Sequence, residues 1–170
     1  MCKIDRFVLV LVVVTLSSCA IRITPLQGQY DKRLERLQKE RDKLNRITDP
    51  VDRTKTGIAI SEILLSLASD AIKTGEPELI GKRLNEYVDT IREAHQTMMK
   101  TGRDAHRKPK GFKDLEIALR RQIRVLEDLA HSVSFDQRDP VEKAKVQASD
   151  IREELLKALF GEQNAPARKS

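Results

Sequence analysis

Apolar residues recur at three- and four-residue steps along most of this chain, and this spacing limits the fold more than any other feature of the sequence. Such steps place side chains on one face of an α-helix, whereas the alternating apolar and polar runs typical of half-buried strands are absent. Charged residues make up 34% of the chain and aromatic residues 4%, a composition typical of long helices. The sequence therefore predicts an all-α fold over residues 29–160, an antiparallel bundle of about five helices.

Prolines, glycines and acidic residues divide this region into its helices. Asp49-Pro50 and Asp139-Pro140 each place an N-cap acceptor before a proline at the first helical position, and glycines mark helix ends. The expected helices span residues 29–48, 50–73, 77–101, 112–133 and 140–160. The second of them is the most apolar, so we expect it to lie at the centre of the bundle.

Three features of these helices leave alternatives open. Residues 49–55 and 139–145 read "DPVDRTK" and "DPVEKAK", which indicates either a duplicated helical hairpin or two helix starts that converged on the same signals. Glu62 and Asp70 lie within the most apolar helix, either as buried acids or on its exposed face. The narrow apolar stripe of residues 29–48 suits a partner helix in the same chain or in a second copy, so a homo-oligomer stays open.

The first eighteen residues have the layout of a signal peptide. Two basic residues precede an apolar run from Phe7 to Leu16, and small residues follow it. This run is about half the roughly 20 residues that a membrane-spanning helix needs. The segment Leu16-Ser17-Ser18-Cys19 resembles the lipobox of bacterial lipoproteins. The resemblance implies cleavage before Cys19, a diacylglyceryl thioether on its sulfur, and acylation of the new amino terminus with a fatty acid such as palmitate.

This interpretation places the mature chain in a bacterial cell envelope, facing the periplasm. We expect residues 19–28 to form a lipidated tether, and Ala20 favours the outer membrane under the enterobacterial sorting rule. Residues 161–170 are polar, and we expect them to be disordered. Cys2 leaves with the signal peptide, so the mature chain has no second cysteine with which to form an internal disulfide.

The positive charge of the chain is concentrated in one place. The formal net charge is +6, and residues 1–18 contribute one of these charges. Residues 100–113 contain six basic residues and one acidic residue. Their net charge of +5 equals the net charge of the chain without residues 1–18. We interpret residues 102–113 as a flexible basic loop that binds an acidic partner, anionic lipid headgroups or phosphate, or else as a solvated loop. The candidate binding residues are Arg103, Arg107, Lys108, Lys110, Lys113, Arg120, Arg121 and Arg124.

Other chemistry has little support in the sequence. His95, Met98 and Met99 stand at helical spacing and carry soft copper(I) ligands, although methionine is also a common core residue. We predict no catalytic residue, no cofactor and no nucleic-acid binding, because no catalytic grouping has motif context and no aromatic residues interleave the cations.

The expected function is therefore a non-catalytic structural or protein-interaction component of the envelope, anchored to a membrane through Cys19. The alternative is a binder or sensor of an anionic ligand through the basic loop, or of a metal through the face of His95, Met98 and Met99.

Overall fold

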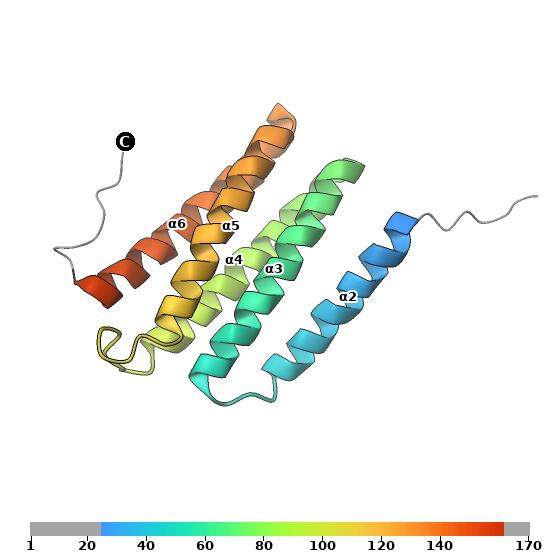
Figure 1. Ribbon diagram of the computed structural model, residues 1–170. Helices are drawn as coiled ribbons and strands as arrows, with labels where there is room; N and C mark the ends of the chain where they lie inside the picture. Colours follow the sequence, from blue (N-terminus) through green and yellow to red (C-terminus); the bar gives the residue numbers. More distant parts are fainter. Residues whose placement is uncertain (1–24, 162–170) are drawn as a thin grey trace, which may run out of the picture. The chain divides into compact units, whose positions relative to one another are not determined.

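A computed structural model of the chain describes residues 25–161 (Figure 1). The chain divides into two units, residues 1–32 and 33–170. The helices are α2 (Pro25–Leu44), α3 (Pro50–Thr74), α4 (Pro77–Met99), α5 (Phe112–Ser132) and α6 (Arg138–Phe160), with a short 3-10 helix, η1 (Phe135–Gln137), before α6. No strand occurs within the described range. These helices confirm the predicted all-α fold of about five helices with antiparallel neighbours.

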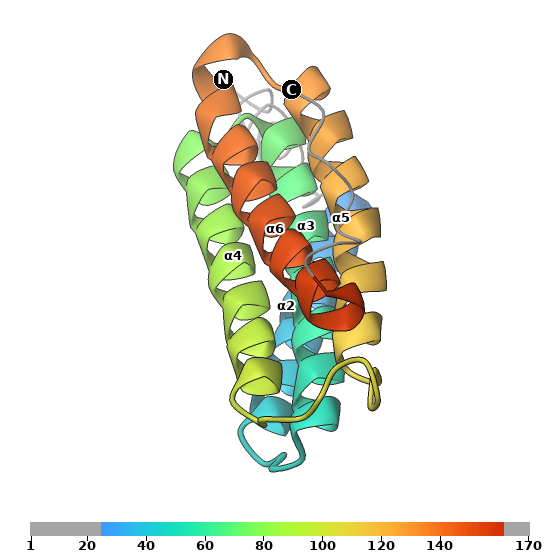
Figure 2. The same ribbon diagram turned by 90° about the vertical axis from the view of Figure 1, so that its left-hand side faces the viewer.

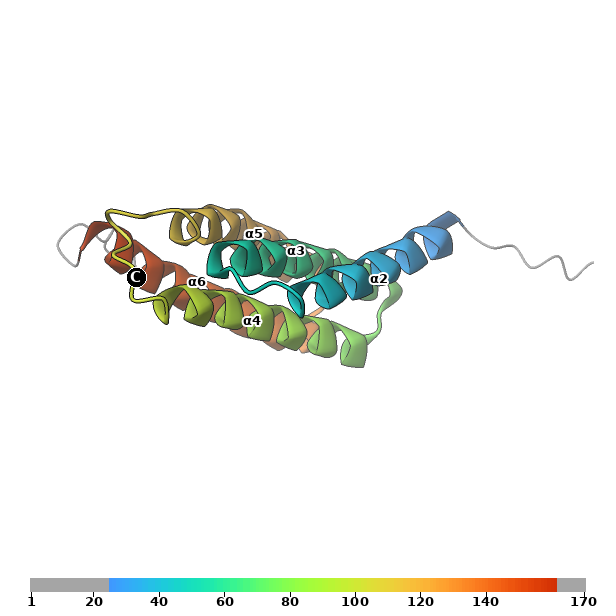
Figure 3. The same ribbon diagram turned by 90° about the horizontal axis from the view of Figure 1, so that it is seen from below.

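The second unit is built from two antiparallel helical hairpins, α3 with α4 and α5 with α6. The hairpins lie side by side, so that α3 packs against α5 and α4 packs against α6. Figures 2 and 3 show the same arrangement from two further directions. Because α4 and α5 lie diagonally across the bundle, residues 100–111 must cross its end to join them.

The core lies among α3, α4, α5 and α6. Fully buried large side chains come from α3, α4 and α5, and α6 adds Val141, Leu155 and a stripe of alanine and leucine. As expected from its apolar sequence, α3 is central, with twelve buried residues that face both α4 and α5. Apolar burial of this kind is the main favourable contribution to the folding of a helical bundle.

The part of α2 within the second unit attaches to the bundle in a different way. Leu37 is the one buried residue between Arg33 and Leu44. Arg33 lies 2.6 Å from Ser66 Oγ and 2.7 Å from the Asp70 carboxylate, while Arg41 lies 3.1 Å from Glu86. This part of α2 therefore packs on the outside of the four-helix bundle and contributes one buried side chain.

The bounds of α2 differ from the expected 29–48, because the helix begins at Pro25 and ends at Leu44. Proline is well suited to a first helical turn, where its missing N–H would have no partner, so residues 25–28 are helical although the sequence predicts no helix there. At the other end, Arg53 donates hydrogen bonds to the carbonyls of Leu44 and Ile47, at 3.0 Å and 3.1 Å, and so stabilises the turn that ends the helix.

The two Asp-Pro signals have different outcomes. Asp49 is the N-cap of α3 as predicted, and its Oδ1 accepts a hydrogen bond from the Asp52 N–H at 2.9 Å. Asp139 is not a cap, because α6 begins one residue earlier at Arg138 and no side chain caps it. The reason is that η1 leads directly into α6, so the backbone is already wound when it reaches Asp139.

Gly111 and Gly81 give a matched test of how closely the crossing from α4 to α5 packs against the core. Gly111 has φ +87°, and a Cβ there would lie 2.7 Å from the Met98 sulfur, whereas a Cβ on Gly81 would meet nothing within 4 Å. We predict that Gly111→Ala lowers the free energy of unfolding by about 1–3 kcal/mol, because the left-handed backbone is strained for alanine. Gly81→Ala should raise it by about 0.5–1 kcal/mol through helix propensity. Urea unfolding followed by circular dichroism measures both, and equal midpoints would contradict the packing at Gly111.

Candidate functional site

The eight cations expected to bind a partner are all exposed. Four lie in the loop of residues 100–111, the crossover loop, and Lys113 lies in the first turn of α5. The other three follow on the outer side of α5. We call this set the basic surface: Arg103, Arg107, Lys108, Lys110, Lys113, Arg120, Arg121 and Arg124.

The crossover loop is connected to itself and to the bundle by hydrogen bonds and packing. Asp104 Oδ1 accepts from the N–H groups of His106 and Arg107 at 2.9 Å and 3.3 Å, and the Asp104 carbonyl accepts from the Lys108 N–H at 2.9 Å. Ala105 is buried, and His106 Nδ1 lies 3.2 Å from the carbonyl oxygen of Leu159 at the end of α6. The loop therefore presents its cations from a defined backbone.

Most cations of the basic surface have no side-chain partner among residues 25–161. The exceptions are Arg107, which lies 3.5 Å from Asp104, and Arg120, which lies 2.6 Å from Glu116. Residues 102–124 contain eight basic residues against three acidic ones. The surface therefore carries a positive field that would attract an acidic partner.

Glu116 is a buried acid that the sequence analysis missed. Its carboxylate lies 2.6 Å from Arg120 on the same helix and 2.9 Å from Arg152 on α6. Burial alone would raise the pKa of Glu116, but the hydrogen bonds and charges of the two arginines outweigh it and lower the pKa below its ordinary value. The same pairing raises the pKa of Arg120. This pair of contacts connects the inner side of α5 to α6, directly beneath the basic surface.

Two exposed apolar residues lie among the cations. Ile117 and Val125 are both exposed on α5, and Ile117 stands four residues after Lys113 and four before Arg121, on the same outer side. A surface that combines unpaired cations with exposed aliphatic side chains suits an amphipathic acidic partner, which offers both charge and apolar contact.

His95, Met98 and Met99, the alternative metal-binding face of the sequence, do not share one environment. Met98 is fully buried in the core near Gly111, whereas Met99 is exposed. The His95 ring is buried between α4 and α6, with Nε2 3.4 Å from the Glu154 carboxylate. Adjacent residues on a helix point about 100° apart, so the two sulfurs do not converge. Within residues 25–161, no three His, Cys, Asp or Glu side chains gather to hold a metal ion.

A buried polar chain joins α3, α4 and α5. Gln122 donates to Ser61 Oγ at 2.7 Å and accepts from the Tyr87 hydroxyl at 3.3 Å, while Ser61 donates to the Ile58 carbonyl at 2.8 Å. Burial raises the pKa of Tyr87, so its hydroxyl stays protonated. Gln122, Ser61 and Tyr87 therefore satisfy one another across three helices, which suits a structural role for these side chains.

These buried polar residues could have been found from the helical spacing. Gln122 stands three residues after Leu119 and four before Leu126, and Glu116 stands three before Leu119, so both occupy positions of the apolar stripe. By contrast, Glu62 is exposed, and Asp70 is partly exposed beside Arg33. The two acids singled out in the most apolar helix are therefore not buried acids.

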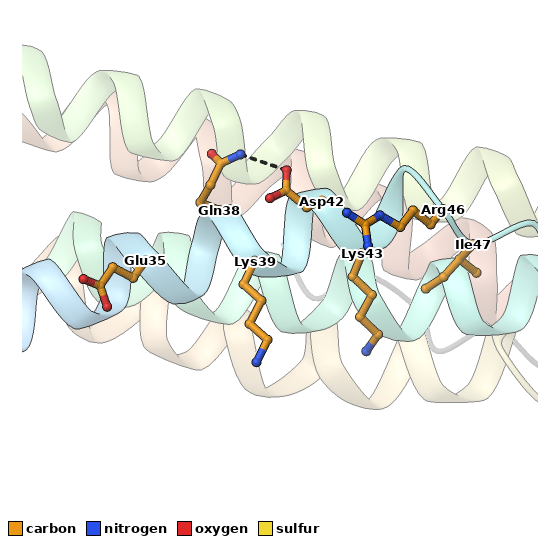
Figure 4. Close-up of a pocket in the computed structure, with 7 residues that line it drawn as sticks. All are labelled: Glu35, Gln38, Lys39, Asp42, Lys43, Arg46 and Ile47. Atoms are coloured by element: carbon orange, nitrogen blue, oxygen red, sulfur yellow. Dashed lines mark hydrogen bonds between the residues drawn. The ribbon is translucent and has the colours of Figure 1, made fainter.

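A shallow hollow lies along α2 (Figure 4). Its lining comes from α2 and the turn after it: Glu35, Gln38, Lys39, Asp42, Lys43, Arg46 and Ile47. Gln38 donates to Asp42 Oδ1 at 2.9 Å, and three cations face two acids in the set. Because the charges nearly balance, the hollow favours neither an anionic nor a cationic ligand, in contrast to the basic surface.

Comparison with protein families, with curated proteins and with solved structures found no match. Among residues 25–161, no helix combines the length and apolarity that crossing a bilayer requires. Cys19, the signal peptide of residues 1–18 and the tail of residues 162–170 lie outside the described residues.

Buried His95, between α4 and α6, makes the stability of the protein depend on pH. Burial lowers its pKa below the ordinary 6.5, although the Glu154 charge opposes the shift. As the pH falls, the unfolded state therefore binds the proton before the folded state does. The contribution of His95 to the free energy of unfolding is complete above pH 6.5 and decreases as the pH drops toward the folded pKa.

We predict that His95→Gln reduces the loss of stability between about pH 7.5 and 5, relative to the unchanged protein. Urea midpoints at both pH values measure this difference. In a companion variant, Glu154→Gln, the pKa of His95 should fall further, because the charge that raises it is gone. An NMR titration of the His95 ring in which this pKa rises would contradict the arrangement.

Proposed function

We propose that this protein is a non-catalytic component of a bacterial cell envelope that is anchored by lipid on Cys19 and docks an acidic partner protein through the basic surface. The observation that carries the proposal is the ordered crossover loop, which presents cations without side-chain partners beside exposed apolar residues of α5. The anchor rests on the resemblance of Leu16-Ser17-Ser18-Cys19 to a lipobox. Two or more acyl chains would hold the protein firmly on a membrane.

The spread of the cations favours a protein over a small anion. From Lys113 to Arg124 the helix rises about 17 Å, and the crossover loop extends the basic surface beyond its start. A single phosphate contacts only a few side chains, whereas an acidic protein surface can face all eight. Exposed Ile117 and Val125 also fit a protein partner, because a phosphate offers them nothing to pack against.

Triple substitution of the basic surface tests the docking. We predict that Arg107→Ser, Lys108→Ser and Lys110→Ser together abolish recovery of the partner in pull-downs from native envelope, because three exposed charges are lost from the loop. Helical circular dichroism should be unchanged, since all three side chains are exposed.

The matched control removes the same charge elsewhere. Arg36, Lys39 and Lys143 are exposed residues of α2 and α6, and their triple substitution to serine should leave partner recovery intact. If the two triple variants recover equal amounts of partner, the basic surface is not the docking site.

The alternative function is a binder of an anionic ligand, favoured by the six cations that have no side-chain partner among residues 25–161. Inorganic phosphate and vesicles containing phosphatidylglycerol serve as separate probes. A ligand that binds the native state raises the unfolding midpoint by mass action. A rise that the triple serine variant of the loop loses would favour this alternative over a protein partner.

The anchor has its own test. We predict that Cys19→Ala leaves the precursor unprocessed and abolishes labelling by a radioactive fatty acid, because the thiol that accepts the diacylglyceryl group is absent. Cys2→Ala is the control, since Cys2 belongs to the segment that is removed. Labelling that survives Cys19→Ala would contradict the lipobox interpretation.

A further inference from the structure

The last turn of α6 carries an exposed aromatic ring beside the crossover loop. Phe160 is the final residue of this helix, and its exposed fraction is 56%. The carbonyl oxygen of the residue before it, Leu159, lies 3.2 Å from His106 Nδ1 in the crossover loop. Figures 2 and 3 show the end of α6 next to this loop. Phe160 therefore stands at the edge of the basic surface.

The side of α6 that carries Phe160 is the side that faces α5. Arg152, Leu156 and Phe160 stand at four-residue steps, so their side chains share one face of the helix. Arg152 lies 2.9 Å from Glu116, which directs this face toward α5. Because α5 is antiparallel to α6 and begins at Phe112, its first turn lies level with Leu156, and Phe160 lies one turn further on. This position explains why Leu156 is buried while Phe160 is exposed.

A cation and a second exposed apolar residue continue this surface on α5. Lys113 lies in the first turn of α5, and Ile117 follows four residues later on the same side of the helix. Along the bundle, Phe160 and Ile117 stand about two helical turns apart, or about 12 Å, with Lys113 at a level between them. We call these three residues the mixed patch: Phe160, Lys113 and Ile117.

The charge around the mixed patch is positive. Residues 102–124 contain eight basic residues and three acidic ones. Of these acids, Glu116 is buried and pairs with two arginines, and Asp104 accepts hydrogen bonds within the loop. On α6, the carboxylate of Glu153 pairs with Lys157 at 3.1 Å. The patch therefore attracts an acidic surface and repels a basic one.

We propose that the partner docks on the mixed patch through an acidic segment that carries apolar side chains, which pack on Phe160 and Ile117 while an acidic side chain pairs with Lys113. This inference rests on the proposed docking of an acidic partner and adds α6 to the docking site. Aromatic residues are enriched in the apolar centre of protein interfaces, and charged residues surround that centre. A ligand that offers charge alone gains nothing from the ring.

The experiment uses the full protein as its host produces it, purified in a neutral detergent. The probes are two fluorescently labelled acidic peptides of equal length and equal charge, which differ only in carrying leucine or serine at the same two positions. Fluorescence anisotropy gives the dissociation constant of each peptide, and detergent without protein is the blank. The ratio of the two constants measures the preference of the protein for apolar side chains.

We expect the leucine peptide to bind the unchanged protein several-fold more tightly than the serine peptide. Phe160→Ser should remove most of this preference, because the ring is gone, and Phe160→Leu should keep part of it. Phe135→Ser is the matched control and should leave the preference unchanged, because Phe135 is 89% exposed at the opposite end of α5 from the crossover loop. Helical circular dichroism should be the same for all variants.

Equal dissociation constants for the two peptides, or a preference that survives Phe160→Ser, would overturn the mixed patch. Loss of both peptides in the triple serine variant of the loop would then show that the docking itself stands. A dimer in analytical ultracentrifugation that Phe160→Ser abolishes would also overturn the inference, because a second copy would be the occupant. If neither peptide binds the unchanged protein, the docking of an acidic partner fails, and this inference fails with it.

Discussion

The diagonal connection between α4 and α5 is the constraint on which the rest of this structure depends. Two antiparallel hairpins pack with α3 against α5 and α4 against α6, so residues 100–111 must cross one end of the bundle. Asp104, buried Ala105 and the contact of His106 with Leu159 fix that crossing. Gly111 then turns the chain into α5 with a positive φ that few other residues tolerate. The concentration of cations in this loop thereby becomes a surface feature with a defined position.

Helix α5 connects this surface to the core. Its inner side carries Gln122, which bonds to α3 and α4, and Glu116, which pairs with Arg152 on α6. Its outer side carries cations and two exposed aliphatic residues. Buried polar groups with all their partners specify one packing arrangement more sharply than apolar groups do. The geometry of the basic surface is therefore set by contacts on the opposite side of the same helix.

The five helices, the central position of α3 and the cap at Asp49 could be predicted from sequence, because spacing and capping are local signals. The prediction was wrong where distant residues decide the outcome. Helix α6 starts at Arg138, before the expected Asp139-Pro140 signal, because η1 leads into it. The basic residues were found as a run of charge, but their ordering by Asp104 and the burial of Glu116 beside Arg152 depend on the tertiary fold.

The most direct test of the central claim is photo-crosslinking in the cells that make this protein. A photoreactive amino acid replaces Lys108 on the basic surface in one variant and Lys143 on α6 in another; both positions are exposed, so neither replacement disturbs the core. The proposed docking predicts one discrete crosslinked protein from position 108 and none from position 143. Crosslinks of equal strength from both positions, or a discrete product from position 143 alone, would contradict it.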